Sequence, residues 1–260
     1  MKLGSKVAIV TGAGRGLGRA AAVAMAQEGA DVVIVSRTPR ELEETADMII
    51  CGGGTVIILE GDLARPEDVK RTAVTALESF GRIDVLMNNA SIITPMKHCH
   101  EITGDEWRYA LNVDLLAPIL MAREVIPTMI GQGGGKIINV TSGLAEIVLS
   151  PFAVYSVAKA GLNHLTRIMA FELKSHNIQV NGLDPGLMDT RMQEEIRNAG
   201  AAVLGANVHR RFEGYREQGL LVPPEKLARL VLFLASFESD NVTGEIGGAA
   251  DFVRFGYRDD

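Results

Sequence analysis

Short apolar runs and longer amphipathic stretches alternate along the first ninety residues. The apolar runs are rich in β-branched residues, which is typical of strands, while the stretches between them carry apolar residues at helical spacing. Such alternation predicts a parallel sheet whose strands are joined by right-handed helical crossovers. The predicted strands are Val7–Val10, Val32–Val35, Val56–Leu59 and Ile83–Met87, and the predicted helices span 16–28, 39–50 and 66–80.

The alternation continues in the second half of the chain, where Lys136–Thr141 and Ile178–Leu183 predict strands and a helix is expected around 152–173. No Pro/Ser-rich linker marks a domain boundary, and 260 residues are enough for one large core. We therefore predict an α/β fold, a doubly wound parallel sheet of the Rossmann type, as a single domain over residues 1–260. The glycine runs at 52–54 and 133–135 are expected to be turns.

Charge and composition argue against several classes of protein. The chain has 26 Lys and Arg against 32 Asp and Glu, a net charge of −6, and lacks the basic excess of a nucleic-acid-binding protein. The short apolar run after Lys6 is too short for a signal sequence or a membrane span, so a soluble, cytoplasmic protein is expected. Cys51 and Cys99 lack CxxC spacing and no histidine stands at ligand spacing, so no metal site is predicted.

One glycine-rich segment stands where phosphate binding requires it, between the first strand and the first helix. The segment 11–18 reads TGAGRGLG. A helix N-terminus offers free backbone N–H groups and the positive end of its dipole to a phosphate, and glycine allows a close approach. The common dinucleotide pattern G-x-G-x-x-G would need glycine where Leu17 stands. The chain instead offers G-x-x-x-G-x-G, with Gly12, Gly16 and Gly18.

A phenol and an ammonium group are expected on one face of the helix around 152–173. Tyr155 and Lys159 are four residues apart, hence about one helical turn. Ser142 follows the strand before this helix, and Asn112 precedes them all. A neighbouring positive charge favours phenolate over phenol, so that tyrosine can exchange a proton nearer neutral pH than its ordinary pKa of about 10 allows.

The spacing TGxxxGxG and the ordered set Asn112, Ser142, Tyr155 and Lys159 resemble the signatures of the short-chain dehydrogenase/reductase family, and in general the 3-oxoacyl carrier-protein reductases and related carbonyl reductases. The resemblance implies an NAD(P)-dependent oxidoreductase that passes a hydride between the nicotinamide and a ketone or secondary alcohol. Tyr155 would be the acid/base, Ser142 would donate a hydrogen bond to the substrate oxygen, and Lys159 would stabilise the phenolate. Asn112 would hold a water linked to Lys159. Pro118 favours a helix that breaks near Asn112 and restarts.

The cofactor is predicted from the end of the second strand, Ser36–Arg37, which lacks the carboxylate that accepts hydrogen bonds from the ribose of NAD. Arg37, aided by Arg15, suits a 2′-phosphate by its charge and its forked donors. We therefore predict NADP(H), with NAD(H) as the alternative. By resemblance, the other cofactor-binding residues are Gly12, Gly14, Gly16, Leu17, Asp62, Leu63, Asn89, Ala90, Pro185, Gly186, Met188 and Thr190, with Tyr155 and Lys159. Ser91 stands where the family signature NNAG has glycine.

The segment from about 187 to 222 is expected, by the same resemblance, to cover the active site as a lid. It carries both apolar residues and arginines, so its composition leaves an apolar ketone and an acidic substrate open. The basic residues with which the reductases dock a carrier protein would fall near Gln132–Gly133 and at His176, which disfavours that substrate. A homotetramer or dimer is expected because the family's last strand commonly lies at a subunit contact.

Other functions remain open at this stage. A nucleotide sensor would bind NADP(H) without turnover, but it would have no need of Ser142, Tyr155 and Lys159. An NAD-dependent alcohol or sugar dehydrogenase of the same family is a second alternative. An epimerase or dehydratase of the longer related branch fits poorly with the chain length and the glycine spacing.

Overall fold

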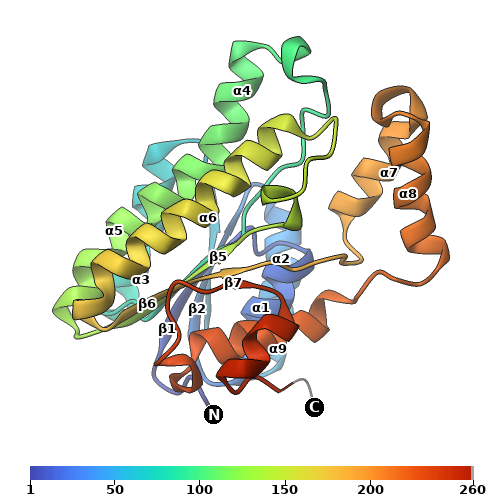
Figure 1. Cartoon of the computed structure of the whole chain (residues 1–260). Coiled ribbons are helices and arrows are strands. Elements are labelled where there is room, and N and C mark those ends of the chain that lie inside the picture. Colours follow the sequence, from blue (N-terminus) through green and yellow to red (C-terminus); the bar gives the residue numbers. More distant parts are fainter. Residues whose placement is uncertain (259–260) are drawn as a thin grey trace.

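Within residues 1–258, which the computed structural model describes, seven strands form one parallel sheet (Figure 1). The strand order is β3-β2-β1-β4-β5-β6-β7, so the connections run in opposite directions from β1 and from β4. The strands are β1 (Val7–Thr11), β2 (Asp31–Ser36), β3 (Val56–Glu60), β4 (Val85–Asn88), β5 (Gly135–Val140), β6 (Ile178–Leu183) and β7 (Ile246–Gly247).

Helices cover both faces of the sheet (Figure 1). One face carries α1 (Gly16–Gln27), α2 (Pro39–Cys51) and α9 (Pro224–Ala235). The other carries α3 (Pro66–Phe80), α5 (Ala117–Gly131) and α6 (Ala153–Leu173). The remaining helices are α4 (Gly104–Leu111), the hairpin of α7 (Arg191–Leu204) and α8 (Ala206–Glu217) at the right of Figure 1, and α10 (Ala249–Phe252). No helix of the described residues is long and apolar enough to cross a membrane.

Continuously apolar strands fold here because successive side chains enter opposite layers of the core. Ala8 and Val10 pack against α1 and α9, whereas Ile9 packs into the layer under α3 and α5. In β2, Val32 belongs to the first layer and Val33 to the second. This alternation follows from the period of two along a strand, and it confirms the doubly wound sheet predicted from the uninterrupted apolar runs.

The predicted strands and helices are confirmed to within two residues at their ends. The largest difference lies at β4, which begins at Val85 and not at Ile83. The Asp84 backbone still bonds to Val7 and Lys136, but at this end of the strand the Val7 amide donates to the Asp84 carboxylate, which also accepts from Arg82. The helices of segment 187–222 had no counterpart in the sequence prediction.

The expected break in the helix near Asn112 is confirmed in part, because one α-helix ends at Leu111 and the next begins at Ala117, but the two are joined without a gap. The chain continues from α4 through a π-helical turn, Asn112–Leu116, directly into α5, and the Ala117 amide donates to the Asn112 carbonyl five residues earlier. The wide turn accommodates Pro118 in the first turn of α5, where a missing amide donor and the ring cause little disruption. Asn112 and Asp114 are therefore presented from a π-helical turn, a feature often found at functional sites.

Candidate active site

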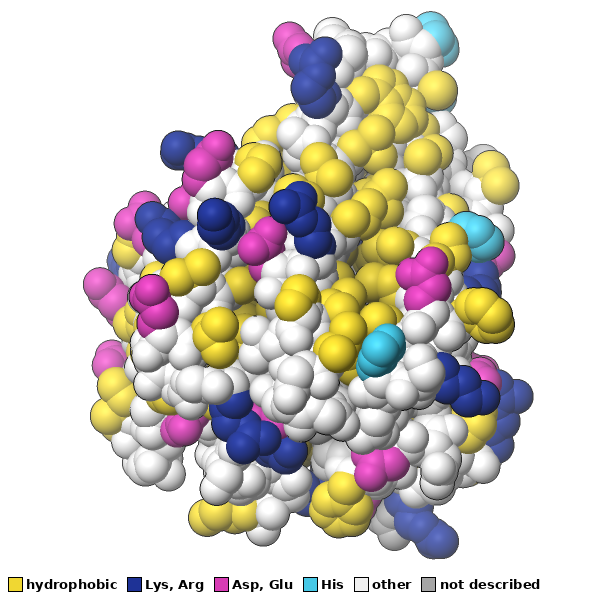
Figure 2. All heavy atoms as spheres, turned by 90° about the vertical axis from the view of Figure 1, so that its left-hand side faces the viewer, with side chains coloured by type: hydrophobic (Ala, Val, Ile, Leu, Met, Phe, Trp, Pro, Cys, Tyr) yellow, Lys and Arg dark blue, Asp and Glu magenta, His cyan; other side chains and the backbone are white. Residues whose placement is uncertain are grey.

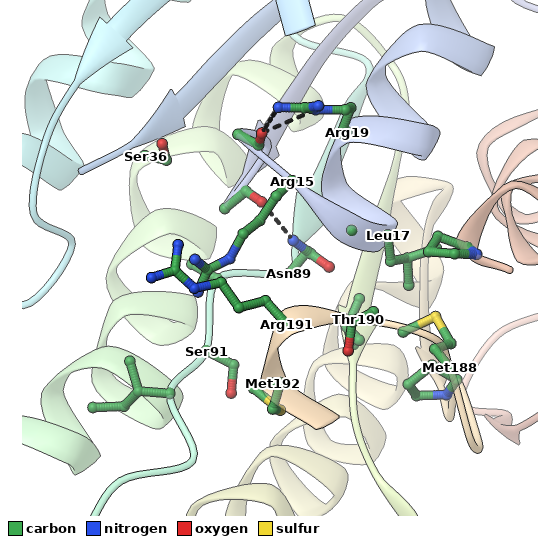
Figure 3. A pocket seen from close by; sticks show the side chains of 18 of the residues that line it. Arg15, Leu17, Arg19, Ser36, Asn89, Ser91, Met188, Thr190, Arg191 and Met192 are labelled. Atoms are coloured by element: carbon green, nitrogen blue, oxygen red, sulfur yellow. Dashed lines mark hydrogen bonds between the residues drawn. The ribbon is translucent and has the colours of Figure 1, made fainter. Parts of the chain in front are cut away.

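A cleft of about 500 Å³ opens at the carboxyl ends of the strands, where the sheet order reverses between β1 and β4. In open α/β sheets this is the crevice in which ligands bind. Figure 3 shows side chains from the glycine segment, from the loops after β2 and β4, and from segment 187–222 around it. The predicted cofactor residues that line it are Gly12, Gly14, Arg15, Gly16, Leu17, Ser36, Arg37, Asp62, Leu63, Asn89, Ala90, Tyr155, Lys159, Pro185, Met188 and Thr190. Gly186, Ser142 and Asn112 are not among the lining residues.

The glycine segment brings backbone to the surface of the cleft. A Cβ on Gly18 would lie 2.4 Å from the Gly12 carbonyl oxygen and 2.5 Å from Asn89 Nδ2, so a larger residue would push the loop apart. Asn89 Nδ2 in turn donates to that carbonyl at 3.1 Å. Gly16 has a φ of +56°, and a Cβ added there would meet, among the described residues, the side chain of Thr190 at 3.4 Å. This bare loop at the N-terminus of α1 fits the diphosphate of a dinucleotide.

At the end of the cleft near β2, the structure adds a carboxylate that the sequence analysis missed. Arg15 Nη1 lies 3.5 Å from Glu41 Oε1, while Arg37 Nη1 donates to the Tyr109 hydroxyl at 2.6 Å. Glu41 belongs to the first turn of α2, a preferred position for acidic residues. Because only two residues separate β2 from α2, this position could have been found by extending the search one helical turn past Arg37.

Tyr155 and Lys159 lie together at the inner part of the cleft. Lys159 Nζ is 5.5 Å from the centroid of the Tyr155 ring and donates a hydrogen bond of 2.8 Å to the Val140 carbonyl. Both residues are buried, and the Ser142 hydroxyl lies close enough to the phenol to lower its pKa. Three of the four predicted catalytic residues are thus brought together. Asn112 lies in the π-helical turn that packs against α6, the helix that carries Tyr155 and Lys159.

Two further polar groups lie beside this set. Asp114 is 1% exposed; its Oδ1 accepts a hydrogen bond of 2.9 Å from the Ile92 amide, while its Oδ2 has no partner within the described residues. The Ser91 hydroxyl lowers the pKa of both Asp114 and Tyr155, yet it forms no hydrogen bond of normal geometry within residues 1–258. Asp114 could have been noticed in the sequence as a lone acidic residue in an apolar run.

Burial dominates the pKa of each titratable group here. It raises the pKa of Asp114 from 3.8 to about 6 against the opposing charge of Lys159. It also raises the pKa of Tyr155, and the charges of Asp114 and Asp184 raise it further. Burial lowers the pKa of Lys159, which Asp114 partly offsets. The protein by itself therefore holds Tyr155 as a neutral phenol, able to donate a proton.

The segment of the chain that builds this cleft matches a known family. Residues 6–201 match the family described as short chain dehydrogenase. The chain belongs to the short-chain dehydrogenase family. It is accordingly an NAD(P)-dependent oxidoreductase that acts on alcohol or carbonyl groups. The described residues contain no group of three or more His, Cys, Asp or Glu side chains placed to hold a metal ion.

Individual short-chain dehydrogenases are similar along nearly the whole chain. The cyclohexanol dehydrogenase of Acinetobacter sp. is 30% identical over 94% of this chain and 92% of its own length. The crystal structure of carveol dehydrogenase from Mycobacterium avium, in complex with NAD, has a TM-score of 0.83 at 27% identity and covers 97% of this chain and 99% of its own. A structure from Beutenbergia cavernae with NADP bound at low occupancy has a TM-score of 0.84 at 32% identity, with coverages of 95% and 96%.

Proposed function

We propose that this short-chain dehydrogenase interconverts an apolar ketone and the corresponding secondary alcohol, with NADP(H) as the preferred cofactor and Tyr155 as the acid/base. The observation that carries the proposal is the position of Tyr155 and Lys159. The Lys159 Nζ lies 5.5 Å from the centre of the Tyr155 ring, and both residues line the same cleft as the glycine loop. The cofactor, when bound there, supplies or accepts the hydride.

In the reductive direction the Tyr155 hydroxyl gives its proton to the substrate oxygen. Burial favours this protonated form, so the chain holds the donor ready. Ser142, whose hydroxyl lowers the pKa of the same phenol, stabilises the charge that develops on that oxygen. In the oxidative direction the Lys159 ammonium stabilises the phenolate by its charge. We assign Asn112, held in the π-helical turn, the supporting role of linking Lys159 to solvent.

The charge of Asp114 opposes this oxidative step, so removing the charge should change the pH dependence of alcohol oxidation. The carboxylate raises the pKa of Tyr155, and oxidation requires the phenolate. Asp114→Asn should therefore lower the pKa of the phenol and move the pH profile of kcat/KM for alcohol oxidation to lower pH by about one unit. Asp105→Asn, with a side chain 92% exposed, is the matched control. An unchanged profile, or one displaced to higher pH, would contradict the assigned electrostatics.

The preference for NADP(H) rests on the arginines at the β2 end of the cleft. Arg37 is exposed, and within residues 1–258 its hydrogen-bond partner is the Tyr109 hydroxyl, which leaves other donors for a phosphate. We expect Arg37→Ala to weaken NADPH binding about ten-fold and to leave NADH binding within about two-fold, because a charge-assisted hydrogen bond contributes roughly 1.5–3 kcal/mol. Fluorescence titration with each reduced cofactor measures both constants. An equal effect on the two cofactors would count against the assignment.

An apolar substrate is supported by the side chains packed around Tyr155. Ile93, Phe152 and Ile196 form a buried cluster with the tyrosine. Of the arginines of segment 187–222, Arg210 is exposed and Arg211 donates to the Tyr215 hydroxyl. Arg191 lines the cleft beside Glu41, and Arg197 is buried on α7. The cyclohexanol and carveol dehydrogenases among the relatives are named for secondary alcohols of this kind.

The function is tested by following cofactor absorbance at 340 nm with a matched panel of cyclic ketones, ketoacids and acyl thioesters, each with NADPH and NADH. We expect the highest kcat/KM for uncharged cyclic ketones with NADPH. Preference for a ketoacid would overturn the substrate class, preference for NADH would overturn the cofactor, and no oxidation with any member of the panel would overturn the function itself.

We also propose that segment 187–222 acts as a lid and that the protein forms a homo-oligomer. The lid is supported by Met188, Thr190 and Met192, which reach into the cleft from this segment (Figure 3). Oligomerisation is supported by hydrophobic side chains that run down the face shown in Figure 2, over α5 and α6. The large hydrophobic residues exposed on α5, on α6 and in the turn before α5 are Leu116, Ile130, Val157, Ile168 and Phe171. Light scattering that finds only monomer would remove the second proposal.

A further inference from the structure

Four charged residues form a closed ring across the mouth of the cofactor cleft. Arg15 Nη1 and Arg191 Nη1 lie 3.5 Å and 3.4 Å from the same atom, Glu41 Oε1. Arg15 Nη2 and Arg191 Nε lie 3.4 Å and 3.7 Å from Glu195 Oε1. The ring joins three separate parts of the chain: Arg15 precedes α1, Glu41 is in the first turn of α2, and the other two residues are on α7.

The two guanidinium groups of this ring form only long contacts with their carboxylate partners. Each carboxylate uses a single oxygen for both arginines, and every distance exceeds the 2.7–2.9 Å of a close charge-assisted hydrogen bond. Arg19 provides the contrast within the same region, because its donors are held by the Gly14 carbonyl, by Thr45 and by Glu44 at 2.9 Å. Arg15 and Arg191 can therefore exchange their partners at low cost, whereas Arg19 cannot.

The position of the ring defines the anion that can make this exchange. Arg15 and Arg191 line the cleft, and Figure 3 shows their side chains converging on one side of it. Their shared partner Glu41 packs against Gly14, where Ser36 at the end of β2 also lies close. This is the end of the cleft that receives the adenosine ribose in a doubly wound sheet. A phosphate on that ribose would meet two converging guanidinium groups, whose forked donors suit it.

We propose that Arg191 of α7 is a ligand of the cofactor's 2′-phosphate, which takes the place of Glu41 and Glu195 as the acceptor for Arg15 and Arg191. The inference rests on the proposed preference for NADP(H). It adds a residue of the lid to the phosphate-binding residues proposed in the glycine loop and after β2. Because Arg191 belongs to segment 187–222, the 2′-phosphate ties that segment to the N-terminus of α1. NAD(H), which lacks this phosphate, leaves the arginines with their carboxylates.

The test compares two probes that differ by one group, 2′,5′-ADP and 5′-AMP, by isothermal titration calorimetry on the whole protein. We expect Arg191→Gln to weaken 2′,5′-ADP about ten-fold and 5′-AMP less than two-fold. Glu195→Gln should tighten 2′,5′-ADP a few-fold, since it removes the competing carboxylate without touching the arginines. Arg210→Gln makes the same charge change on the exposed part of α8 and should alter neither constant.

The outcomes separate this inference from the proposed function. If Arg191→Gln weakened both probes equally, the arginine would contact the 5′-phosphate or serve only to stabilise the fold. If it weakened neither, the arginine would bind no part of the cofactor. Either result overturns the inference, while NADPH-dependent turnover by the wild type would still support the proposed function. Wild-type protein that binds both probes equally would refute the cofactor preference itself. Thermal unfolding of each variant checks that the fold is retained.

Discussion

Replacing Tyr155 by phenylalanine is expected to lower kcat for ketone reduction by about 10²–10⁴-fold while cofactor affinity stays within about two-fold. The phenol hydroxyl is the group that transfers the proton, and phenylalanine removes it while keeping the ring that packs with Phe152 and Ile196. Steady-state kinetics at 340 nm gives the first quantity and fluorescence titration with NADPH gives the second.

Two observations accompany this expected result. Tyr215→Phe removes a phenol from α8 of the same segment and should leave kcat unchanged, because its hydroxyl accepts from Arg211 and lies outside the cleft wall. If Tyr155→Phe retained the wild-type rate, the proton would have to come from another donor, and the assigned chemistry would be wrong.

Lys159→Met should produce the second large effect, a loss of about 10²-fold in alcohol oxidation at neutral pH. The substitution keeps the length and apolar stem of a side chain that is 2% exposed but removes the ammonium that stabilises the Tyr155 phenolate. Without that charge the pKa of the phenol rises, so activity should recover as the pH is raised, with the profile displaced upward by about 1–3 units. A full pH profile of kcat/KM measures the displacement.

Lys174→Met, at an exposed position just after α6, is the control for this change. The displacement has the opposite sign to that expected for Asp114→Asn, since one variant removes a positive charge near the phenol and the other a negative one. If both variants shifted the profile in the same direction, a common structural disturbance would explain them better than electrostatics.

The sheet and its first three crossovers could be predicted from sequence because local pattern determines them. A strand buried on both faces, such as Val32–Val35, must be continuously apolar, and an amphipathic helix must follow it. Tyr155 and Lys159 could be paired for the same reason, since four residues on a helix set their separation. These features depend on spacing within one element.

Features formed between distant elements could not be predicted in this way. Glu41 is 26 residues from Arg15 and 150 residues from Arg191, and Asp114 is 45 residues from Lys159. No local periodicity in the sequence indicates that these pairs meet. The helices of segment 187–222 were also missed, since two glycines at 200 and 205 with positive φ interrupt the helical pattern there. The π-helical turn was missed because a proline usually indicates that a new helix starts. Here Pro118 lies in the first turn of α5, which continues directly from the π-helical turn.

The π-helical turn also sets the orientation of α4 relative to α5. A π-turn contains one residue more than an α-helix needs, and each residue advances an α-helix by about 100°. The surplus residue therefore fixes the azimuth of α4 relative to α5, so that Tyr109 on α4 reaches Arg37 while Asp114 stays turned inward beside Lys159. An insertion or deletion within 112–116 would rotate α4 relative to α5. The number of residues in this turn is therefore constrained independently of the chemistry of its side chains.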